Sequence, residues 1–590
     1  MTDAAPVPSY HVVFEPIAKP VTCAADETLL ACARRIGLEI AGPCGGQGTC
    51  RGCQIKILQG EVANGQAGEA WQLACQVKPR SDLVVELSAR SLATPERTDV
   101  PGFDVTVAAE PVVRGIAVAM PPPTIADCRA DTQRLADALS LQGASLQRVP
   151  LPVLVALPDI LRRQNWRGTA VLDDEGALRA LLPPDAPVVG LAVDLGTTNV
   201  AAYLMDLGDG RRLAGSGLEN LQRAYGADII TRLTHAVRTA DGRTELARAA
   251  RNTIRMQIET LCQSAGIDAS CIADITVCGN TAMQHLLLGL PVKQLGAAPF
   301  IAVGAEPMEV TARDLDLPAA PGAKVWLFPG IGGYVGGDHV ADVLATQSLQ
   351  KEGVNVVIDI GTNTEISVVQ GETILCLSTP SGPALEGSQI SCGMRAAEGA
   401  IERVRDDGRG GFFVTTIGKG EPVGVCGSGV LDAVAAMLRS GAIDKRGRIA
   451  AGHPATVDWF GRRAVRLAPR VVLTQDDIRA VQLAKSAIRA GIDVLLTSAG
   501  LTEDRIDRVI VAGAFGTYID VGSAMAIGML PPLPSPRFTQ VGNSAGLGAR
   551  LALLSRRMRA AAVALTRRCR YIELSSQADF QRDFMRRINF

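Results

Sequence analysis

Two similar segments, 165 positions apart, constrain the fold of this 590-residue chain more than any other feature. The segments "VVGLAVDLGTTNVAAYLMDL" and "VNVVIDIGTNTEISVVQ" each contain an apolar run, then Asp-x-Gly-Thr, then a second run of strand character. A P-loop needs a lysine and a following helix, whereas a strand follows the glycine turn here. The repeat therefore predicts two phosphate-binding β-hairpins, one in each half of a duplicated α/β domain.

The side chains of the two turns predict phosphoryl chemistry. Asp194 and Asp359 hold equivalent places and would bind Mg²⁺ through water or orient an attacking water. Backbone amides would hold phosphate oxygens beside the hydroxyls of Thr197, Thr198, Thr362 and Thr364.

Small-residue segments follow in an order that identifies a superfamily. The stretch "VIVAGAFGTYID" predicts a strand and then a loop, residues 512–516, that would lie against adenine and ribose. Two small-residue helices, "IGGYVGGDHVADVLA" and "GNSAGLGARLALLS", are of the type that crosses between two lobes. This order resembles the actin, sugar and acetate kinase and heat-shock ATPase superfamily. The resemblance implies two lobes of duplicated βββαβα topology with ATP and Mg²⁺ in the cleft; an unrelated glycine-rich α/β domain is the alternative.

A cysteine cluster near the start of the chain predicts a metal centre. Cys44, Cys50 and Cys53 lie among glycines, and Cys75 follows. Four thiolates are the ligands of a [2Fe–2S] cluster, and strand, strand, helix, loop, strand is the order of a β-grasp ferredoxin. A zinc site is the alternative, although zinc sites usually present two Cys-x2-Cys pairs. Two further cysteines in strand and helix patterns, Cys23 and Cys32, are predicted to be core residues.

The remaining segments predict the domain organisation. Residues 1–88 form the ferredoxin-like domain, 89–101 a linker, 102–185 a small α/β middle domain and 186–590 the ATPase domain. The middle domain is expected to be a spacer or docking module, with oligomerisation as the alternative.

Charge and hydropathy exclude several classes of partner. Lys plus Arg number 59 against 60 Asp plus Glu, so no bulk charge attracts nucleic acid or an anionic membrane. The sequence has no signal-peptide pattern and no run of 18 uncharged apolar residues, so we expect a cytoplasmic protein with metal-binding thiols.

The whole chain resembles the reductive activators of corrinoid-dependent enzymes. The resemblance rests on the cluster, the hairpins and motifs such as "ENLQRAYGADIITRL", "STPSGPALEGSQISCGMRAAEGAI" and "LTQDDIRAVQLAKSAIRAGI". It implies an iron–sulfur ATPase that passes one low-potential electron to a Co(II) corrinoid protein of a methyltransferase system and regenerates Co(I). An upstream electron donor and a homodimer are further expectations.

The resemblance also implies site residues. The cluster ligands are Cys44, Cys50, Cys53 and Cys75. The phosphate and Mg²⁺ group is Asp194, Gly196, Thr197, Thr198, Asp359, Gly361, Thr362 and Asn363. The nucleoside loop contains Gly513, Ala514 and Gly516. Asp338 would approach the metal or the water, and an acid at a helix N-terminus is an equally good interpretation.

Two other function classes stay open at this stage. One is a small-molecule kinase of the same superfamily with a redox-sensing ferredoxin domain. The other is a chaperone-like ATP clamp that would work without its cluster. The roles of Glu386, Cys392 and Lys485, which lie in distinctive motifs, also stay open; Lys485 would pair with Asp476 or Asp477 or face nucleotide.

Overall fold

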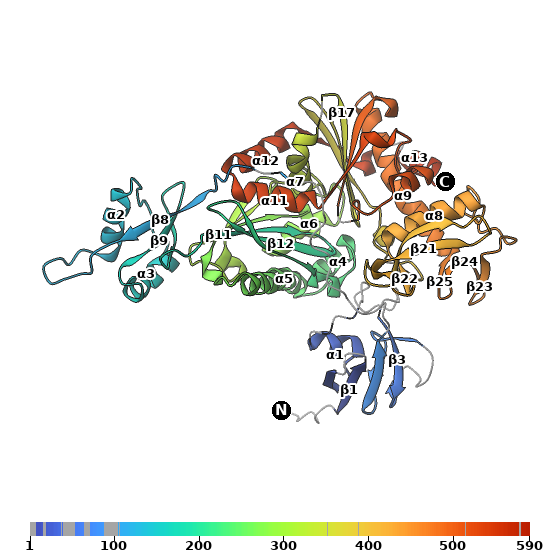
Figure 1. Ribbon diagram of the computed structural model, residues 1–590, viewed down its shortest axis with the longest axis horizontal. Coiled ribbons are helices and arrows are strands. Elements are labelled where there is room, and N and C mark those ends of the chain that lie inside the picture. Colours follow the sequence, from blue (N-terminus) through green and yellow to red (C-terminus); the bar gives the residue numbers. More distant parts are fainter. Residues whose placement is uncertain are drawn as a thin grey trace.

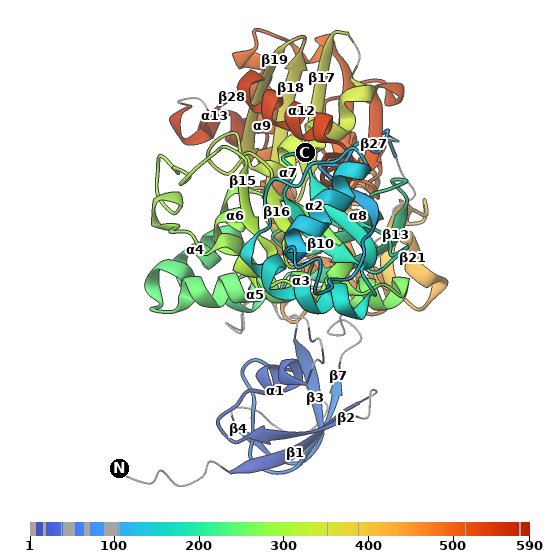
Figure 2. The ribbon, with the colours of Figure 1, turned by 90° about the vertical axis from the view of Figure 1, so that its left-hand side faces the viewer.

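The computed structural model describes residues 8–15, 19–36, 38, 40, 53–63, 71–87, 104–105, 107–350, 352–387, 389–513, 515–577 and 580–590. Two large lobes form the upper body in Figure 1, one small unit projects from its left side and another lies below. Figure 2, turned by 90°, also places the lower unit apart from the lobes. None of the helices in these ranges is both long and apolar enough to cross a bilayer.

The lower unit is a five-stranded sheet with one helix against it. The strand order is β2-β1-β7-β3-β5, with β1 parallel to β7 and antiparallel to β2. Val12 and Phe14 alternate with more exposed residues along β1 and are completely buried. This alternation packs one sheet face on α1 and gives the unit its own hydrophobic core. The elements are β1 (Ser9–Glu15), β2 (Lys19–Ala24), α1 (Leu29–Arg35), β3 (Gln54–Gln59), β5 (Gln72–Leu73) and β7 (Leu83–Leu87), with a short pair β4 (Val62–Ala63) and β6 (Lys78–Pro79).

The projecting unit is a three-stranded antiparallel sheet with two helices. Its elements are β8 (Val113–Ala119), α2 (Asp131–Leu141), α3 (Leu151–Arg163), β9 (Arg167–Asp173) and β10 (Leu178–Leu182), in the sheet order β10-β9-β8. Val171 and Leu182 belong to the same hydrophobic core as the first lobe. The backbone amide of Gly322, in the first lobe, also donates to the carbonyl of Arg179 at 2.9 Å. The unit is therefore packed on the first lobe.

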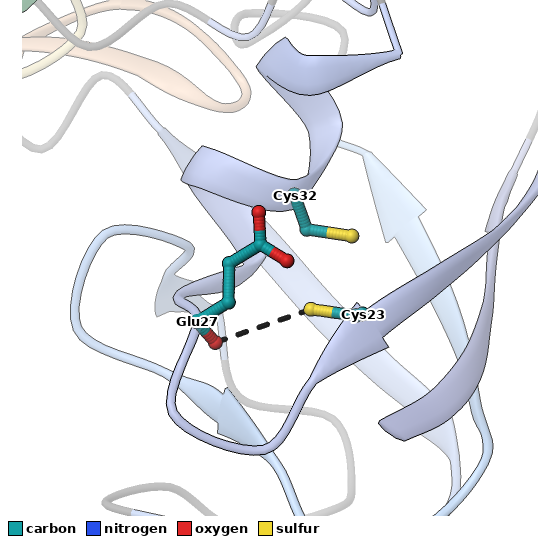
Figure 3. Close-up of side chains that lie close together, drawn as sticks. All are labelled: Cys23, Glu27 and Cys32. Atoms are coloured by element: carbon teal, nitrogen blue, oxygen red, sulfur yellow. Dashed lines mark hydrogen bonds between the residues drawn. The ribbon is translucent and has the colours of Figure 1, made fainter. Parts of the chain in front are cut away.

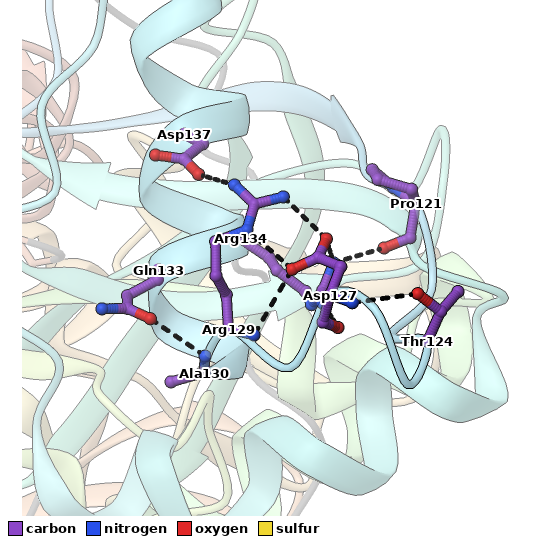
Figure 4. A network of polar contacts seen from close by, with 8 residues as sticks. All are labelled: Pro121, Thr124, Asp127, Arg129, Ala130, Gln133, Arg134 and Asp137. Carbon is purple, nitrogen blue, oxygen red and sulfur yellow. Dashed lines mark hydrogen bonds and ion pairs between the residues drawn. The ribbon is translucent and has the colours of Figure 1, made fainter.

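A charged network closes the loop before α2. The guanidinium of Arg134, a completely buried side chain, pairs with Asp127 at 2.7 Å, and Arg129 pairs with the same carboxylate at 2.8 Å (Figure 4). The hydrogen bonds from Arg129 and then from Arg134 hold the pKa of Asp127 well below its usual value. The network orders a loop far from the lobes, and we assign it a structural role.

The first lobe is built on a six-stranded mixed sheet in the order β13-β12-β11-β14-β16-β15. The central strand β11 is almost entirely buried, which agrees with its continuous apolar run. The strands are β11 (Val189–Leu195), β12 (Asn199–Asp206), β13 (Arg212–Glu219), β14 (Ile272–Cys278), β15 (Met308–Thr311) and β16 (Lys324–Leu327), and the helices are α4 (Ile229–Arg238), α5 (Gly242–Ala265), α6 (Thr281–Leu288) and α7 (Gly337–Thr346).

The second lobe repeats this plan and adds two small sheets. Its main sheet has the order β27-β26-β17-β18-β19-β28. The main strands are β17 (Val354–Ile360), β18 (Thr364–Gln370), β19 (Thr373–Thr379), β26 (Ile506–Ala512), β27 (Phe538–Gly542) and β28 (Cys569–Tyr571). The small sheets contain β20 (Ala400–Asp406), β21 (Phe412–Thr416) and β22 (Gly424–Val425), and β23 (Thr456–Trp459), β24 (Arg462–Ala468) and β25 (Val471–Thr474). The helices of this lobe are α8 (Gly427–Ser440), α9 (Gln475–Ser498), α10 (Val521–Ala526) and α13 (Phe580–Arg586). Two further helices, α11 (Ser544–Leu554) and α12 (Arg556–Arg568), belong to the same half of the chain but pack mainly on the first lobe.

Strand register confirms that the lobes are duplicates. In the first lobe, β11 pairs antiparallel with β12 and parallel with β14, so Asp194 lies opposite Cys278. In the second lobe, β17 pairs antiparallel with β18 and parallel with β26, so Asp359 lies opposite Ala512. The two predicted hairpins therefore occupy the same position in equivalent sheets.

Two small-residue helices join the lobes, as their composition predicts. Helices α7 and α11 pack so closely that a Cβ on Gly548 would lie 2.2 Å from the carbonyl oxygen of Ala341. Although α11 comes late in the chain, the hydroxyl of Thr276 on β14 donates to the carbonyl of Ala549 at 2.9 Å. Only glycine at position 548 allows this backbone-to-backbone approach.

Candidate functional site

A cavity of about 310 Å³ lies between the lobes, where the two hairpin turns face each other. Most of the residues predicted for the nucleotide site line it. They are Asp194, Gly196, Thr197, Thr198, Asp338, Asp359, Gly361, Thr362, Asn363 and Gly513. The structure thus brings residues from the two halves of the repeat into one cleft.

The turn glycines are required by close backbone approaches. A Cβ on Gly196 would lie 2.5 Å from the carbonyl oxygen of Asn199. Gly513 has φ +88°, and a Cβ there would lie 2.5 Å from Oδ1 of Asp359. Gly516 lies three residues after Gly513, and a Cβ there would lie 2.1 Å from the carbonyl oxygen of Ala512. Ala514 lies outside the described residues. Gly513 therefore lets the predicted nucleoside loop touch the second hairpin.

Thr364 differs from the other predicted hydroxyl donors. It is completely buried, and its hydroxyl makes a 2.8 Å hydrogen bond with the hydroxyl of Ser381. The hydroxyl of Ser381 also donates to the carbonyl of Gly361 at 2.8 Å. Thr364 therefore stabilises the second hairpin through its hydrogen bond with Ser381.

Carboxyl groups from both lobes line the cleft. Burial raises the pKa of Asp194 to about 7, although a hydrogen bond from Asn543 opposes the shift. Burial likewise raises the pKa of Asp359 to about 6. The pKa of Asp338 is raised well above its usual value by burial and by the charge of Asp359. Carboxylate oxygens gathered in this way fit a hard divalent cation such as Mg²⁺, because the cation offsets their mutual repulsion.

Two asparagines that the sequence analysis missed orient the first hairpin. Asn280 caps α6 by accepting from the amide of Met283 at 3.0 Å, and its Nδ2 donates to the hydroxyl of Thr197 at 3.1 Å. Asn543 caps α11 in the same way, and its Nδ2 donates to Oδ2 of Asp194 at 2.9 Å. A second repeat in the sequence could have identified these asparagines. The segments "GNTA" at 279–282 and "GNSA" at 542–545 each join a strand to a helix.

Asp342 and Glu386 are further acids of the cleft. Asp342 on α7 is completely buried, and the hydroxyl of Ser544 donates to its Oδ1 at 2.5 Å. Burial, and then the charge of Asp359, raise its pKa well above the usual value. Asp342 lies one helical turn after Asp338, which is the spacing that could have identified it.

Two of the four predicted cluster ligands lie in the described part of the lower unit. Cys53 precedes β3 and Cys75 follows β5, and both are buried. The amide of Ala74 donates to the carbonyl of Cys53 at 2.8 Å, which brings the two cysteines to one corner of the sheet. The corner fits thiolate ligation of an iron–sulfur cluster. Cys44 and Cys50 lie outside the described residues.

Comparison with known proteins matches both halves of the chain. Residues 14–80 match the family of the 2Fe-2S iron-sulfur cluster binding domain, 104–186 the RACo linker region, 189–351 the RACo middle region, and 353–590 the C-terminal domain of RACo, the ASKHA domain. The corrinoid activation enzyme RamQ of Eubacterium limosum is 32% identical over 575 residues, which cover 93% of this chain and 94% of RamQ. The chain belongs to the family of corrinoid reductive activators.

Two other relatives support this membership. A "[Co(II) methylated amine-specific corrinoid protein] reductase" of Methanosarcina barkeri is 26% identical over 60% of this chain and 68% of its own length. A solved structure titled "Reductive activator for corrinoid,iron-sulfur protein" is 32% identical, with a TM-score of 0.73 and 98% of each chain covered. This family member thus carries a [2Fe–2S] ferredoxin domain and a two-lobed ATP-binding domain, which confirms the predicted fold class.

A second sulfur pair lies in the core of the activator's ferredoxin domain. One sulfur or carboxylate atom each of Cys23, Glu27 and Cys32 lies within 4.8 Å of the others (Figure 3). The carboxylate of Glu27 is already paired with Arg35 at 2.9 Å, and this hydrogen bond lowers its pKa. Both cysteines are completely buried, which confirms that they are core residues.

Lys485 and Cys392 lie in packing environments. The ammonium group of Lys485 donates to the carbonyls of Arg587 and Asn589 and lies 5.5 Å from the ring centroid of Phe590. It therefore holds the C-terminal segment against α9. Cys392, whose role the sequence leaves open, is buried.

Proposed function

We propose that this protein activates a corrinoid protein by an ATP-dependent reduction, in which one low-potential electron converts Co(II) to the Co(I) needed for methyl transfer. The observation that carries the proposal is the likeness to RamQ, which spans the ferredoxin domain and the ATP-binding lobes together. A small-molecule kinase would need only the two ATP-binding lobes, and a chaperone-like ATP clamp would not need the cysteines of the ferredoxin domain.

The energetic need explains why both parts occur in one chain. Each 100 mV of uphill potential costs about 2.3 kcal/mol for one electron. Nucleotide-dependent differences in affinity for a partner typically supply a coupling free energy of about 1–3 kcal/mol. Binding and hydrolysis of ATP would therefore shift the equilibrium enough to make the transfer proceed.

The chain's own residues would perform three tasks. A [2Fe–2S] cluster, which stores and releases single electrons when bound, would be held by Cys44, Cys50, Cys53 and Cys75. Asp194, Asp338 and Asp359 would hold Mg²⁺. Phosphate would be held by the backbone amides of Gly196, Thr197, Thr198, Gly361, Thr362 and Asn363. The nucleoside would lie against Gly513, Ala514 and Gly516.

The organisation and setting of the protein are part of the proposal. We place the ferredoxin-like domain at residues 1–88, the linker at 89–101, the middle domain at 102–185 as a spacer or docking module, and the ATPase domain at 186–590. A separate low-potential donor would reduce the cluster in the cytoplasm, and two chains would associate.

An anaerobic optical assay tests the function. Reduced protein is mixed with a Co(II) corrinoid protein, with and without Mg²⁺ and ATP, and the Co(I) band is followed. We expect Co(I) only with ATP, and we expect no Co(I) from the Cys50→Ser variant, because the cluster would lose a ligand. The Cys128→Ser variant is the matched control, since Cys128 is an exposed cysteine of the projecting unit.

Two results would contradict the proposal. Co(I) formation by Cys50→Ser would favour a clamp. Active ATP hydrolysis without Co(I) from any of several corrinoid partners, together with a phosphorylated small molecule, would favour a kinase.

A further inference from the structure

Glu386 bridges the two hairpins across the cleft. The hydroxyl of Thr198, from the first hairpin, donates to Oε2 of Glu386 at 2.9 Å. The hydroxyl of Thr362, from the second hairpin, donates to Oε1 at 2.7 Å. The two hydroxyl oxygens lie 3.3 Å apart. Both carboxylate oxygens are therefore held by donors from different lobes, which fixes the orientation of the carboxylate in the cavity.

The backbone around Glu386 is attached to the second hairpin. Glu386 ends the short 3-10 helix η6 (Pro383–Glu386). Before this helix, the amide of Gly382 donates to the carbonyl of Thr362 at 2.8 Å. After it, Gly387 has φ +75°, and a Cβ there would lie 2.4 Å from the carbonyl oxygen of Met394. The carboxylate is thus positioned by the turn that would hold phosphate.

The hydrogen-bond arrangement separates two tasks. Each threonine hydroxyl has one proton, and Thr198 and Thr362 both donate it to Glu386. Backbone amides are therefore the donors that stay available for phosphate oxygens. A carboxylate and a terminal phosphate repel each other. A water molecule fits between them when it donates a proton to the carboxylate and its oxygen lone pair faces the phosphorus.

Glu386 also differs from the other acids of the cleft. Asp338, Asp342 and Asp359 lie close enough for their charges to act on one another, and a divalent cation would offset this repulsion. Glu386 instead accepts from the hydroxyls of Thr198 and Thr362 and, like Asp338 and Asp359, is partly exposed to the cavity. Its carboxylate thus lies in the cavity between the two turns that would hold phosphate.

We infer that Glu386 is the general base of ATP hydrolysis in this protein. This inference rests on the proposed function. The water oxygen forms a bond to the γ-phosphorus, and one water proton passes to a carboxylate oxygen of Glu386. The bond from the γ-phosphorus to the bridging oxygen breaks, and its electron pair leaves with ADP. Glu386 then releases the proton to the phosphate product or to solvent.

Steady-state ATP hydrolysis by the full chain tests the inference. We expect Glu386→Gln to lower kcat about 100-fold or more, which is the range for a lost general base, with KM for ATP unchanged. Glu398→Gln is the matched control, because Glu398 is an exposed glutamate twelve positions later in the same lobe and should keep both constants. Glu386→Asp should recover part of kcat, since it restores a carboxylate.

A second variant covers the case in which Glu386→Gln fails to fold. Thr198→Val with Thr362→Val keeps the carboxylate but removes its two orienting donors, so kcat should fall about 10-fold or more as the base loses its alignment.

Three results would overturn the inference. An unchanged kcat in Glu386→Gln would show that Glu386 is not the general base. A raised KM with unchanged kcat would make Glu386 a clamp between the lobes. Absence of ATP hydrolysis in the wild-type chain would remove the proposed function itself, whereas the first two results leave that function intact.

Discussion

At the scale of single residues, Asp194 is the best test of the proposed cation site, because it lines the cleft and Nδ2 of Asn543 donates to its carboxylate at 2.9 Å. We expect Asp194→Ala to lower ATP turnover about 100-fold or more through loss of the cation. The visible spectrum of the cluster should stay intact. Asp209→Ala is the control, since Asp209 is an exposed acid of the same lobe. Loss of the cluster spectrum in Asp194→Ala would contradict this division of tasks.

The raised pKa values of the cleft acids predict how stability would change with pH if these acids bind Mg²⁺. Asp194 has a pKa of about 7 and Asp359 of about 6, above their values in an unfolded chain. The folded state therefore binds more protons between about pH 4 and 7, and cation-free protein loses stability as pH rises through this window. Mg²⁺ would offset the loss. The increase in Tm on adding Mg²⁺ should thus be larger at pH 8 than at pH 5, and calorimetry would measure it. An equal increase at both pH values would argue against a cation at these carboxyls.

At the scale of elements, the contact between α7 and α11 is the joint between the lobes. A Cβ at position 548 would lie 2.2 Å from a backbone oxygen of α7, so Gly548→Ala must push the helices apart. We expect a loss of about 1–3 kcal/mol in unfolding free energy, which is typical of overpacking, and weaker ATP binding. Urea unfolding and nucleotide titration would measure these effects. Gly452→Ala is the control, because a Cβ there meets no atom within 4 Å. If Gly548→Ala and Gly452→Ala had the same unfolding free energy and ATP affinity, close packing of α7 and α11 would not be required for either property.

At the scale of the whole molecule, separate cores predict separable activities. The ferredoxin domain has its own hydrophobic core, and the lobes have others. Removing iron with a chelator under reducing conditions should leave ATP hydrolysis and the Tm of the lobes unchanged, while Co(I) formation is lost. Restoring iron and sulfide should restore Co(I) formation. A large fall in ATP turnover on iron removal would instead indicate that the cluster domain controls the cleft.

Local patterns in the sequence by themselves determined the strand–turn–strand hairpins, the order of strands and helix along the ferredoxin domain and the two buried core cysteines. Each of these features depends on neighbouring residues, because side-chain alternation and glycine turns are set over a few positions. The hairpin aspartates and glycines could be named for the same reason. Their metal and nucleotide roles, and the roles of Cys44 and Cys50, stay predictions.

Only the tertiary structure decided which distant residues complete the cleft. Glu386 meets Thr198 across 188 positions, and Asn543 meets Asp194 across 349. Lys485 shows the same limit, because its partners are carbonyls 102 and 104 positions away rather than the neighbouring aspartates or the nucleotide that the sequence suggested. Such contacts follow from how the two lobes pack, since burial and hydrogen bonding across a cleft leave no periodic signal along the chain.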